Sequence, residues 1–314
     1  MSLKVAAAIA AIIAVIPAGV PTRAAQKRAN CTPIPVEKIA LQLYSVRNVL
    51  QPPAPGGRGS GAATPETIDA VFGQLHSIGF RNAELYSGTL GLTIPAYKAL
   101  LAKNGLHALG AHGSLTTDIA AWQTTIGNVV ELGQGPFIGS AGFTASGQSL
   151  NTYAGALEIA ANLNKLGEAA AAKGLRLYLH NHAPEFNTWY DAPGAGGKTT
   201  KMRFIDVIIQ NTDPRYVHLQ IDVHWARVGI GVDKFDELLS FLEARRDRID
   251  LLHVKDTDSM GRYTDLGRGT TDWVKLFAAA GPQIRYYIWE LDDQAHPMQS
   301  AQIAYDYLTC RPGV

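Results

Sequence analysis

Eight short apolar segments recur along the chain, and a segment with helical periodicity follows each of them. The expected strands are Ile39–Tyr44, Phe80–Tyr86, Leu106–His112, Pro136–Gly139, Leu175–His182, Tyr216–Asp222, Ile249–Lys255 and Ile284–Glu290. The expected helices are Pro65–Ser77, Ile94–Asn104, Asp118–Leu132, Tyr153–Lys173, Met202–Gln210, Phe235–Arg245, Trp273–Ala280 and Met298–Leu308. Strands that alternate with helices favour a parallel sheet, because the helix carries the chain back to the next strand. We therefore predict an α/β fold, a single-domain (β/α)8 TIM barrel over residues 39–314.

Length and composition agree with one such barrel. The 314 residues exceed the ~250 of a typical (β/α)8 domain, which leaves room for additional segments. Hydrophobic residues make up 46% of the chain, enough for a large core. Two segments, 51–63 and 189–200, are rich in loop-forming residues and follow strands. We expect both at the rim of the barrel's carboxyl-terminal face, where substrate loops lie.

The first 25 residues are typical of a secretory signal peptide. Lys4 precedes an uncharged run from Val5 to Val20, and small residues end at Ala25. A membrane anchor is the alternative, but Pro17 interrupts the run and it falls short of the ~20 apolar residues that span a bilayer. We expect cleavage near Ala25, residues 26–38 as an N-terminal extension, and an exported protein, periplasmic or secreted, with no membrane association after cleavage.

Charge and cysteine content narrow the possible partners. The formal net charge is +1 with no basic cluster, whereas nucleic-acid binding requires grouped Lys and Arg side chains. We therefore expect no nucleic-acid partner. Cys31 and Cys310 are the two cysteines, one just outside each end of the predicted barrel. In an oxidising compartment we expect a disulfide between them, with two separate thiols as the alternative.

Polar residues end nearly every predicted strand. In a barrel, side chains at the carboxyl ends of the strands face the mouth of the active site. One histidine there is more often a core residue than a ligand, but several unpaired carboxylates in one cavity are costly without a cation. A mixture of imidazole and carboxylate groups suits a transition metal. The residues are Gln42, Tyr44, Glu84, His112, His180, His182, Asp222, His253, Lys255 and Glu290.

At these positions the chain resembles the xylose isomerase-like superfamily of sugar isomerases and epimerases. The motifs are Leu41-Gln-Leu-Tyr-Ser-Val-Arg47, Leu179-His-Asn-His-Ala-Pro-Glu-Phe186, Gln220-Ile-Asp-Val-His-Trp225, Leu252-His-Val-Lys-Asp256, Leu266-Gly-Arg-Gly-Thr-Thr-Asp-Trp273 and Ile288-Trp-Glu-Leu-Asp292. Each motif alone is weak. Six in order at the ends of the expected strands indicate the superfamily, but they do not specify a substrate.

The resemblance implies a divalent metal held by one ligand from each of the last four strands, in many members a Glu, Asp, His and Glu set. Asp222, His253 and Glu290 match the last three ligands. This chain departs at the first, where His180 stands, and Glu185 in the following loop is the competing candidate. We expect His180 to be the ligand. Two imidazoles beside two carboxylates favour Mn, with Zn, Co, Fe and Mg as alternatives.

Further roles follow from position and from the resemblance. A carboxylate or imidazole beside the metal serves as a proton carrier, and a lysine can hold a carbonyl or enolate oxygen. The expected catalytic residues are His182, Glu185, Lys255 and Glu84. The expected substrate-binding residues are Gln42, Tyr44, His112 and Trp225. For Glu84 and His112 the alternative is a hydrogen-bonding role inside the barrel.

These groups point to proton abstraction next to a sugar carbonyl. A divalent ion polarises the carbonyl and stabilises the enolate that forms when a base takes the neighbouring proton. Return of the proton gives isomerisation or epimerisation, and departure of a β-substituent gives elimination. Members that resemble this His-Asn-His pattern include lyases of 3-keto-glycosides, so we expect that chemistry first and isomerisation or epimerisation of unphosphorylated ketoses as the alternative.

Other classes are less consistent with the sequence. The fold also resembles that of metal-dependent abasic-site endonucleases, but these need further zinc ligands and a basic DNA-facing surface. A non-catalytic sugar-binding barrel would not require the full set of matching ligands. We therefore expect a small carbohydrate as the partner, and the sequence leaves a homo-oligomer open.

Overall fold

The computed structural model describes residues 31–52, 61–86, 88–194, 197–293 and 295–311. Eight parallel strands close into a barrel in the order β1, β2, β3, β4, β5, β8, β9 and β12, which confirms the predicted (β/α)8 fold. Their bounds are β1 Ile39–Gln42, β2 Asn82–Leu85, β3 His107–Gly113, β4 Phe137–Ser140, β5 Arg176–His180, β8 Val217–Asp222, β9 Ile249–Val254 and β12 Tyr286–Trp289. Each predicted strand segment overlaps one of these strands; β3 and β4 each extend one residue beyond the predicted end, to Gly113 and Ser140.

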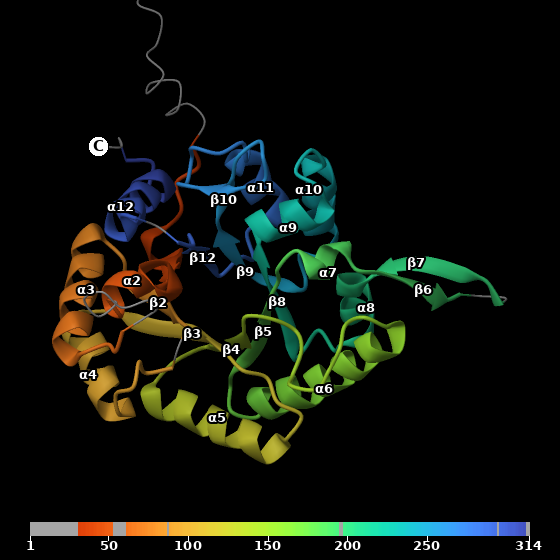
Figure 1. The fold of residues 1–314 in the computed structure, drawn as a ribbon, viewed down its shortest axis with the longest axis horizontal. Helices are drawn as coiled ribbons and strands as arrows, with labels where there is room; N and C mark the ends of the chain where they lie inside the picture. Colours follow the sequence, from red (N-terminus) through yellow and green to blue (C-terminus); the bar gives the residue numbers. More distant parts are fainter. Residues whose placement is uncertain (1–30, 53–60, 87, 195–196, 294, 312–314) are drawn as a thin grey trace, which may run out of the picture.

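Helices surround the strand ring (Figure 1). Those that follow the barrel strands are α2 Arg47–Leu50, α3 Pro65–Ile78, α4 Ile94–Lys103, α5 Ile119–Leu132, α6 Tyr153–Ala171, α8 Phe204–Asn211, α10 Phe235–Ala244, α11 Trp273–Ala280 and α12 Pro297–Leu308. Several starts follow the capping residues in the sequence. Thr64 accepts a hydrogen bond from the Thr67 amide at the start of α3, and Asp118 caps the first amides of α5.

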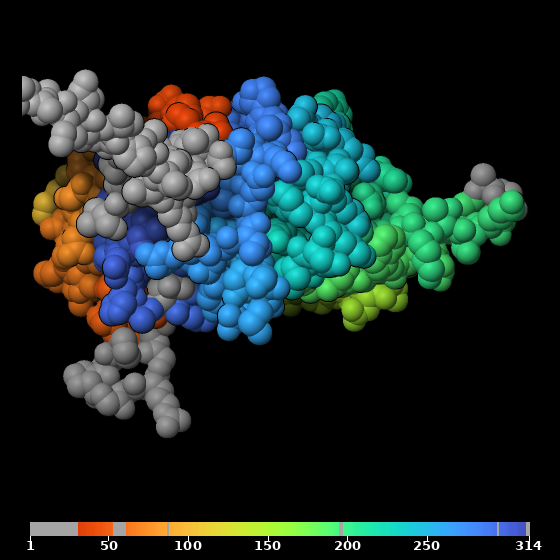
Figure 2. Space-filling model, turned by 90° about the horizontal axis from the view of Figure 1, so that it is seen from above, coloured from red at the N-terminus to blue at the C-terminus, as the bar shows by residue number. Residues whose placement is uncertain are grey.

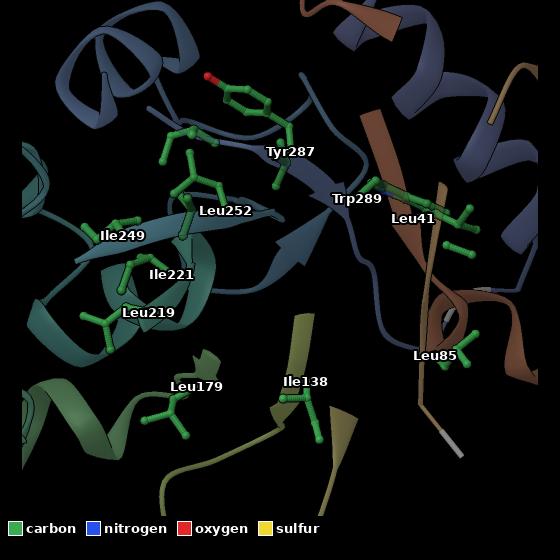
Figure 3. Close-up of a cluster of buried hydrophobic side chains, with 14 of the residues drawn as sticks. Leu41, Leu85, Ile138, Leu179, Leu219, Ile221, Ile249, Leu252, Tyr287 and Trp289 are labelled. Carbon is green, nitrogen blue, oxygen red and sulfur yellow. The ribbon is translucent and has the colours of Figure 1, made fainter. Parts of the chain in front are cut away.

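Strand side chains alternate between two cores. The larger core lies between strands and helices, and Figure 3 shows part of it, with Leu41, Leu252 and Trp289 among the labelled residues. The smaller core fills the inside of the barrel and consists of Ala40, Leu109, Phe137, Tyr178, Leu251 and Ile288. Neighbours such as Leu251 and Leu252 therefore belong to different cores, as the two-residue period of a strand requires.

Glycine makes room inside the barrel for one large ring. A Cβ atom at Gly139 would lie 2.4 Å from Cε1 of Tyr178, closer than any side chain could tolerate. The phenol of Tyr178 can therefore cross the interior and reach the polar layer above it. This explains the short, glycine-containing β4, the strand with the weakest sequence signal.

The segment expected as an irregular rim forms an antiparallel hairpin instead. Strands β6 (Trp189–Pro193) and β7 (Thr199–Arg203) pair with each other and not with the barrel. Burial alternates along β6, with Tyr190 and Ala192 buried and their neighbours exposed. In the sequence, the nearby glycines and Pro193 make this alternation hard to recognise as a strand. The hairpin extends away from the barrel in both views (Figures 1 and 2).

Other short elements also follow the carboxyl ends of strands. They are the helices α7 (Pro184–Asn187) and α9 (Val223–Ile230), the 3-10 helix Leu43–Val46, and the paired strands β10 (Asp256–Thr257) and β11 (Tyr263–Thr264). A further 3-10 helix, Val36–Lys38, precedes β1. Among the described residues no helix is both long and apolar enough to cross a membrane.

The ends of the described chain are joined covalently. Cys31 and Cys310 form the expected disulfide, with an S–S distance of 2.01 Å. The Ile34 amide donates a hydrogen bond to the Leu308 carbonyl at 2.8 Å, so the N-terminal extension runs beside the end of α12. The expected signal peptide, residues 1–25, lies outside the described residues.

Candidate active site

The carboxyl ends of the barrel strands carry a cluster of ionisable side chains. Along β8, Gln220 and Asp222 point inward, whereas Ile221 between them packs in the outer core. The strand-end residues of the cluster are Glu84, His112, His180, Asp222, His253 and Glu290. A cavity of about 440 Å³ adjoins them, and its walls include the predicted site residues Tyr44, His112, His180, His182, Trp225, Lys255 and Glu290.

Four of these residues form a group with the composition of a metal site. The ligand atoms of His180, Asp222, His253 and Glu290 all lie within 4.8 Å of one another, and all four side chains are buried. Nε2 of His180 and Nδ1 of His253 lie 3.9 and 4.0 Å from Oδ2 of Asp222. Glu185 is not in the group. A second group combines His112 with His180 and His253.

Asp222 shows that the group fits a cation. Its Oδ1 accepts the Trp225 amide at 2.8 Å and so caps α9. Its Oδ2 is buried and makes no hydrogen bond within the described part of the chain. Burial raises the pKa of Asp222 to about 6, against the attraction of Lys255. The Lys255 ammonium lies 3.3 Å from this oxygen as an ion pair. A buried carboxylate oxygen that makes no hydrogen bond is costly, and a divalent ion bound by the group would satisfy it.

Lys255 supplies the nearest permanent positive charge. Its Nζ lies 2.8 Å from Oε2 of Glu290, 3.0 Å from Oδ2 of Asp292 and 3.3 Å from Oδ2 of Asp222. Burial alone would lower the pKa of Lys255, but the three carboxylates outweigh it and raise the pKa above its usual range. Lys255 therefore stays charged although it is only 1% exposed.

His253 lies between two carboxylates. Its Nε2 is 2.6 Å from Oε2 of Glu84, and its Nδ1 is 3.0 Å from Oε2 of Glu290. Burial would lower the pKa of this imidazole, but Glu84 and Glu290 together raise it to about 10. In the absence of a metal, His253 is an imidazolium that partly neutralises the cluster.

Five predicted site residues do not line the cavity: Gln42, Glu84, Glu185, Asp222 and His253. Glu84 and Gln42 lie among buried partners below the histidines. Glu84 is fully buried, and burial would raise its pKa, but His112 and His253 lower it to about 2. Gln42 is also fully buried; its Nε2 donates to Glu84 at 2.7 Å and its Oε1 accepts the Tyr44 amide. Both residues are thus placed to support other side chains from below.

The two candidates from the His-Asn-His segment have different surroundings. His182 lines the cavity, and its ring lies 5.7 Å from that of Trp225. Burial and the charge of Lys255 lower the pKa of His182 to about 4. Glu185, at the start of α7, accepts the His182 amide at 2.8 Å, and burial raises its pKa to about 7. Glu185 therefore braces the backbone that carries His182.

The motif from Leu266 to Trp273 forms a loop after β11 that Asp256 anchors. Oδ2 of Asp256 accepts the amides of Gly267 and Gly269 at 2.9 and 3.1 Å. A Cβ atom at Gly269 would lie 2.3 Å from Oδ1 of Asp256, so the loop requires glycine there. This anchoring holds the β10–β11 pair, in which Tyr263 contributes to the cavity wall.

Several residues of the site were not among the predicted ones. Asp292 contacts Lys255. It lies two residues after Glu290, as Lys255 lies two residues after His253, so the sequence pattern could have identified it. Gln220, two positions before Asp222, is likewise visible from strand alternation. Tyr86 and Tyr263 line the cavity from surrounding segments and have no comparable local signal.

Comparisons with known proteins agree with this architecture. The sequence profile of one family, described as xylose isomerase-like TIM barrel, matches residues 71–299. An inosose dehydratase from Bacillus velezensis is 33% identical over 108 residues. That segment covers 34% of this chain and 30% of the Bacillus protein, so the match spans under a third of the relative's length.

Solved structures are similar over nearly the whole chain. A sugar phosphate isomerase/epimerase from Parabacteroides distasonis has a TM-score of 0.69 at 20% identity, covering 90% of this chain and 96% of that one. A 3-keto-D-glucoside 4-epimerase from E. coli has a TM-score of 0.55 at 19% identity, covering 86% and 98% of the two chains. At these identities the similarity establishes the fold.

Proposed function

The chain belongs to the xylose isomerase-like TIM-barrel family, and from this membership we propose that it is a metal-dependent enzyme that removes the proton next to a sugar carbonyl. The observation that carries the proposal is the buried His180, Asp222, His253 and Glu290 group beside a cavity of about 440 Å³. A cavity of this size accommodates a monosaccharide unit with a small substituent.

The proposed metal ligands are two imidazoles and two carboxylates. Oδ2 of Asp222, which makes no hydrogen bond within the described residues, would bind the ion directly. We propose Mn as the native ion, with Zn, Co, Fe and Mg as alternatives, since imidazole suits a transition metal better than Mg. A divalent ion held by this group would polarise a carbonyl and stabilise the negative charge of an enolate.

Residues of the chain itself would carry the proton. His182 lines the cavity and has a neutral imidazole, so we assign it as the proton acceptor. The Lys255 ammonium, at the cavity wall, would hold the substrate oxygen on which charge develops. Trp225 and Tyr44 present aromatic faces at the same cavity and would bind the sugar ring.

Glu84 and Glu185 act indirectly in this scheme. Glu84 holds His253 from beneath, and Glu185 holds the backbone of His182. Neither carboxylate lies in the cavity wall within the described residues, so a direct proton transfer to substrate is better assigned to His182.

We propose elimination from a 3-keto-glycoside as the reaction, with epimerisation or isomerisation of a free ketose as the second candidate. The names of the similar proteins include a dehydratase and a 3-keto-D-glucoside epimerase. Elimination and return of the proton are two fates of the same kind of enolate. The carbonyl at C3 acidifies the proton at C2, and the substituent at C1 then departs.

We propose an unphosphorylated substrate. Among the described residues that line the cavity, Lys255 is the single Lys or Arg side chain, and three carboxylates already surround it. A phosphate dianion would therefore meet more negative than positive charge. The proposed export is consistent with this choice, and the Cys31–Cys310 disulfide is typical of an oxidising compartment.

The test uses the protein without residues 1–25, loaded with Mn²⁺, in D2O with a panel of 3-keto-glycosides and free ketoses. Release of the C1 substituent supports elimination, and interconversion of free sugars supports the epimerase or isomerase. His182→Gln should abolish both activities. His107→Gln is the control and should retain them, because His107 lies at the amino end of β3, away from the cavity. Binding without turnover or deuterium exchange would instead indicate a sugar-binding barrel.

A further inference from the structure

Glu84 accepts a full set of hydrogen bonds although it is fully buried. Oε1 accepts from the Tyr178 hydroxyl at 2.5 Å and from Nε2 of Gln220 at 2.7 Å. Oε2 accepts from Nε2 of Gln42 at 2.7 Å and faces Nε2 of His253 at 2.6 Å. An ionised carboxylate only accepts, so every group that faces it must present a hydrogen.

This requirement orients the Gln220 amide. Its NH2 group must face Glu84, so its carbonyl oxygen Oε1 points the other way. Two ring nitrogens meet that oxygen: Nδ1 of His180 at 3.0 Å and Nε2 of His112 at 2.9 Å. Because a carbonyl oxygen is an acceptor, both nitrogens must carry hydrogen.

The two candidate metal ligands are therefore fixed in complementary ways. His180 keeps its proton on Nδ1, which leaves the lone pair of Nε2 toward Oδ2 of Asp222, 3.9 Å away. Without metal, both ring nitrogens of His253 carry hydrogen, and Nδ1 faces Oε2 of Glu290 at 3.0 Å. Glu84 keeps the hydrogen on Nε2, so Nδ1 is the nitrogen that would give up its proton to a metal on the side of Asp222 and Glu290.

We propose that Glu84 and Gln220 are positioning residues that set the tautomers of both imidazoles, so that Nε2 of His180 and Nδ1 of His253 face one metal position. The inference rests on the proposed metal site and adds how the chain accommodates a histidine as its first ligand. A carboxylate at that position would need no tautomer control, whereas an imidazole in the wrong tautomer would turn an N–H toward the ion.

The same network separates the two possible ligand groups. Nε2 of His112 holds its hydrogen toward Gln220 and lies 3.3 Å from the Glu84 carboxylate. That nitrogen has no lone pair free for a metal. His112 could therefore offer a metal only its Nδ1. The group of His180, Asp222, His253 and Glu290 also supplies two carboxylate charges to the ion, so we favour it over the group of three histidines.

The experiment compares Gln220→Met and Glu84→Gln with Tyr178→Phe. The last variant removes one donor to Glu84 and touches neither of the two ligand imidazoles, so it is the matched control. Nitrogen NMR of histidine-labelled protein without metal reports the His180 tautomer, and calorimetric titration with Zn²⁺ reports affinity.

In the wild type we expect His180 with hydrogen on Nδ1. In Gln220→Met we expect a mixture of tautomers, and both Gln220→Met and Glu84→Gln should bind Zn²⁺ about 10–100-fold more weakly, the usual effect of losing a partner of a ligand. Tyr178→Phe should stay within about twofold by the same reasoning, because both tautomers are retained.

An unchanged His180 tautomer in Gln220→Met would overturn the inference, and so would an equal loss of affinity in Tyr178→Phe. Circular dichroism distinguishes a folding failure in Gln220→Met, in which case Glu84→Gln decides. If the wild type binds no divalent ion, the proposed function fails, while the tautomer in the metal-free protein still decides this inference.

Discussion

The two ends of the barrel interior contain similar ionisable groups in different arrangements. At the amino ends of the strands, Nε of Arg176 donates to Oδ2 of Asp250 at 2.7 Å, and Nδ1 of His218 accepts from Nη2 of Arg176 at 3.0 Å. One cation thus meets one carboxylate. At the carboxyl ends, the carboxylates of Glu84, Asp222 and Glu290 gather beside a cavity.

Each end also contains a buried polar atom without a hydrogen bond, and the two atoms differ in cost. At the amino ends it is Nε2 of His218, on an imidazole whose pKa burial lowers to about 4, so the ring is neutral. At the carboxyl ends it is Oδ2 of Asp222, part of a carboxylate. The charged atom is the more costly one, and its retention indicates a function rather than stability.

Replacement of Asp222 should have the largest effect. Asp222→Asn keeps an oxygen that can cap α9 but removes the charge, so metal affinity should fall by more than the roughly 100-fold that loss of an outer partner can cost. Without metal, its melting temperature should equal or exceed that of the wild type. Calorimetry and metal analysis measure the first effect. Glu290→Gln should also lower affinity steeply, and unchanged metal content in either variant would contradict the ligand set.

Removal of the metal should destabilise the wild type and not Asp222→Asn. An ion that binds only the folded state at about 100 times its Kd adds about 2.7 kcal/mol of stability. Thermal unfolding with Mn²⁺ and with a chelator measures the difference. Equal melting temperatures of the wild type in the two conditions would mean that no ion binds the folded protein.

At the amino ends of the strands, removal of a carboxylate should lower stability and leave metal affinity unchanged, the opposite of the effect expected for Asp222. Asp250→Ala leaves Arg176 without its carboxylate and should cost ~1–3 kcal/mol, less than for a fully buried pair because Arg176 is about a third exposed. Denaturant unfolding gives the stability, and the affinity for Mn²⁺ should stay within about twofold of the wild type, since this pair does not hold a metal ligand. A large loss of affinity would show that the two ends are coupled.

A pH series gives the smallest expected effect. Burial lowers the pKa of His218 from 6.5 to about 4 in the folded protein, so between these values the unfolded chain binds more protons. Stability should therefore fall as pH falls, by on the order of 1 kcal/mol between pH 7 and pH 5 from this group. In His218→Gln, the stability measured from unfolding curves should change less steeply with pH between pH 7 and pH 5. An identical slope would assign the pH dependence to other groups.

The sequence alone predicted the barrel and the residues at its mouth. Strand alternation is a local property, so the inward direction of Asp222, His253 and Glu290 could be derived without a structure. The β6–β7 hairpin was missed because Pro193 and the neighbouring glycines obscure a pairing that depends on the alternation of Tyr190 and Ala192. Tyr263 was missed because its place at the cavity depends on a loop anchored by Asp256.

Which strand-end residues line the cavity and which lie beneath it was decided only by the tertiary structure. Alternation gives Gln42, Glu84 and Lys255 the same inward direction, but depth depends on the stagger of neighbouring strands and on what fills the barrel below. Because Tyr178 crosses the interior and donates to Glu84, that carboxylate is held beneath the histidines, while Lys255 reaches the cavity wall. Periodicity along one strand determines direction, whereas depth and hydrogen-bond partners come from strands distant in sequence.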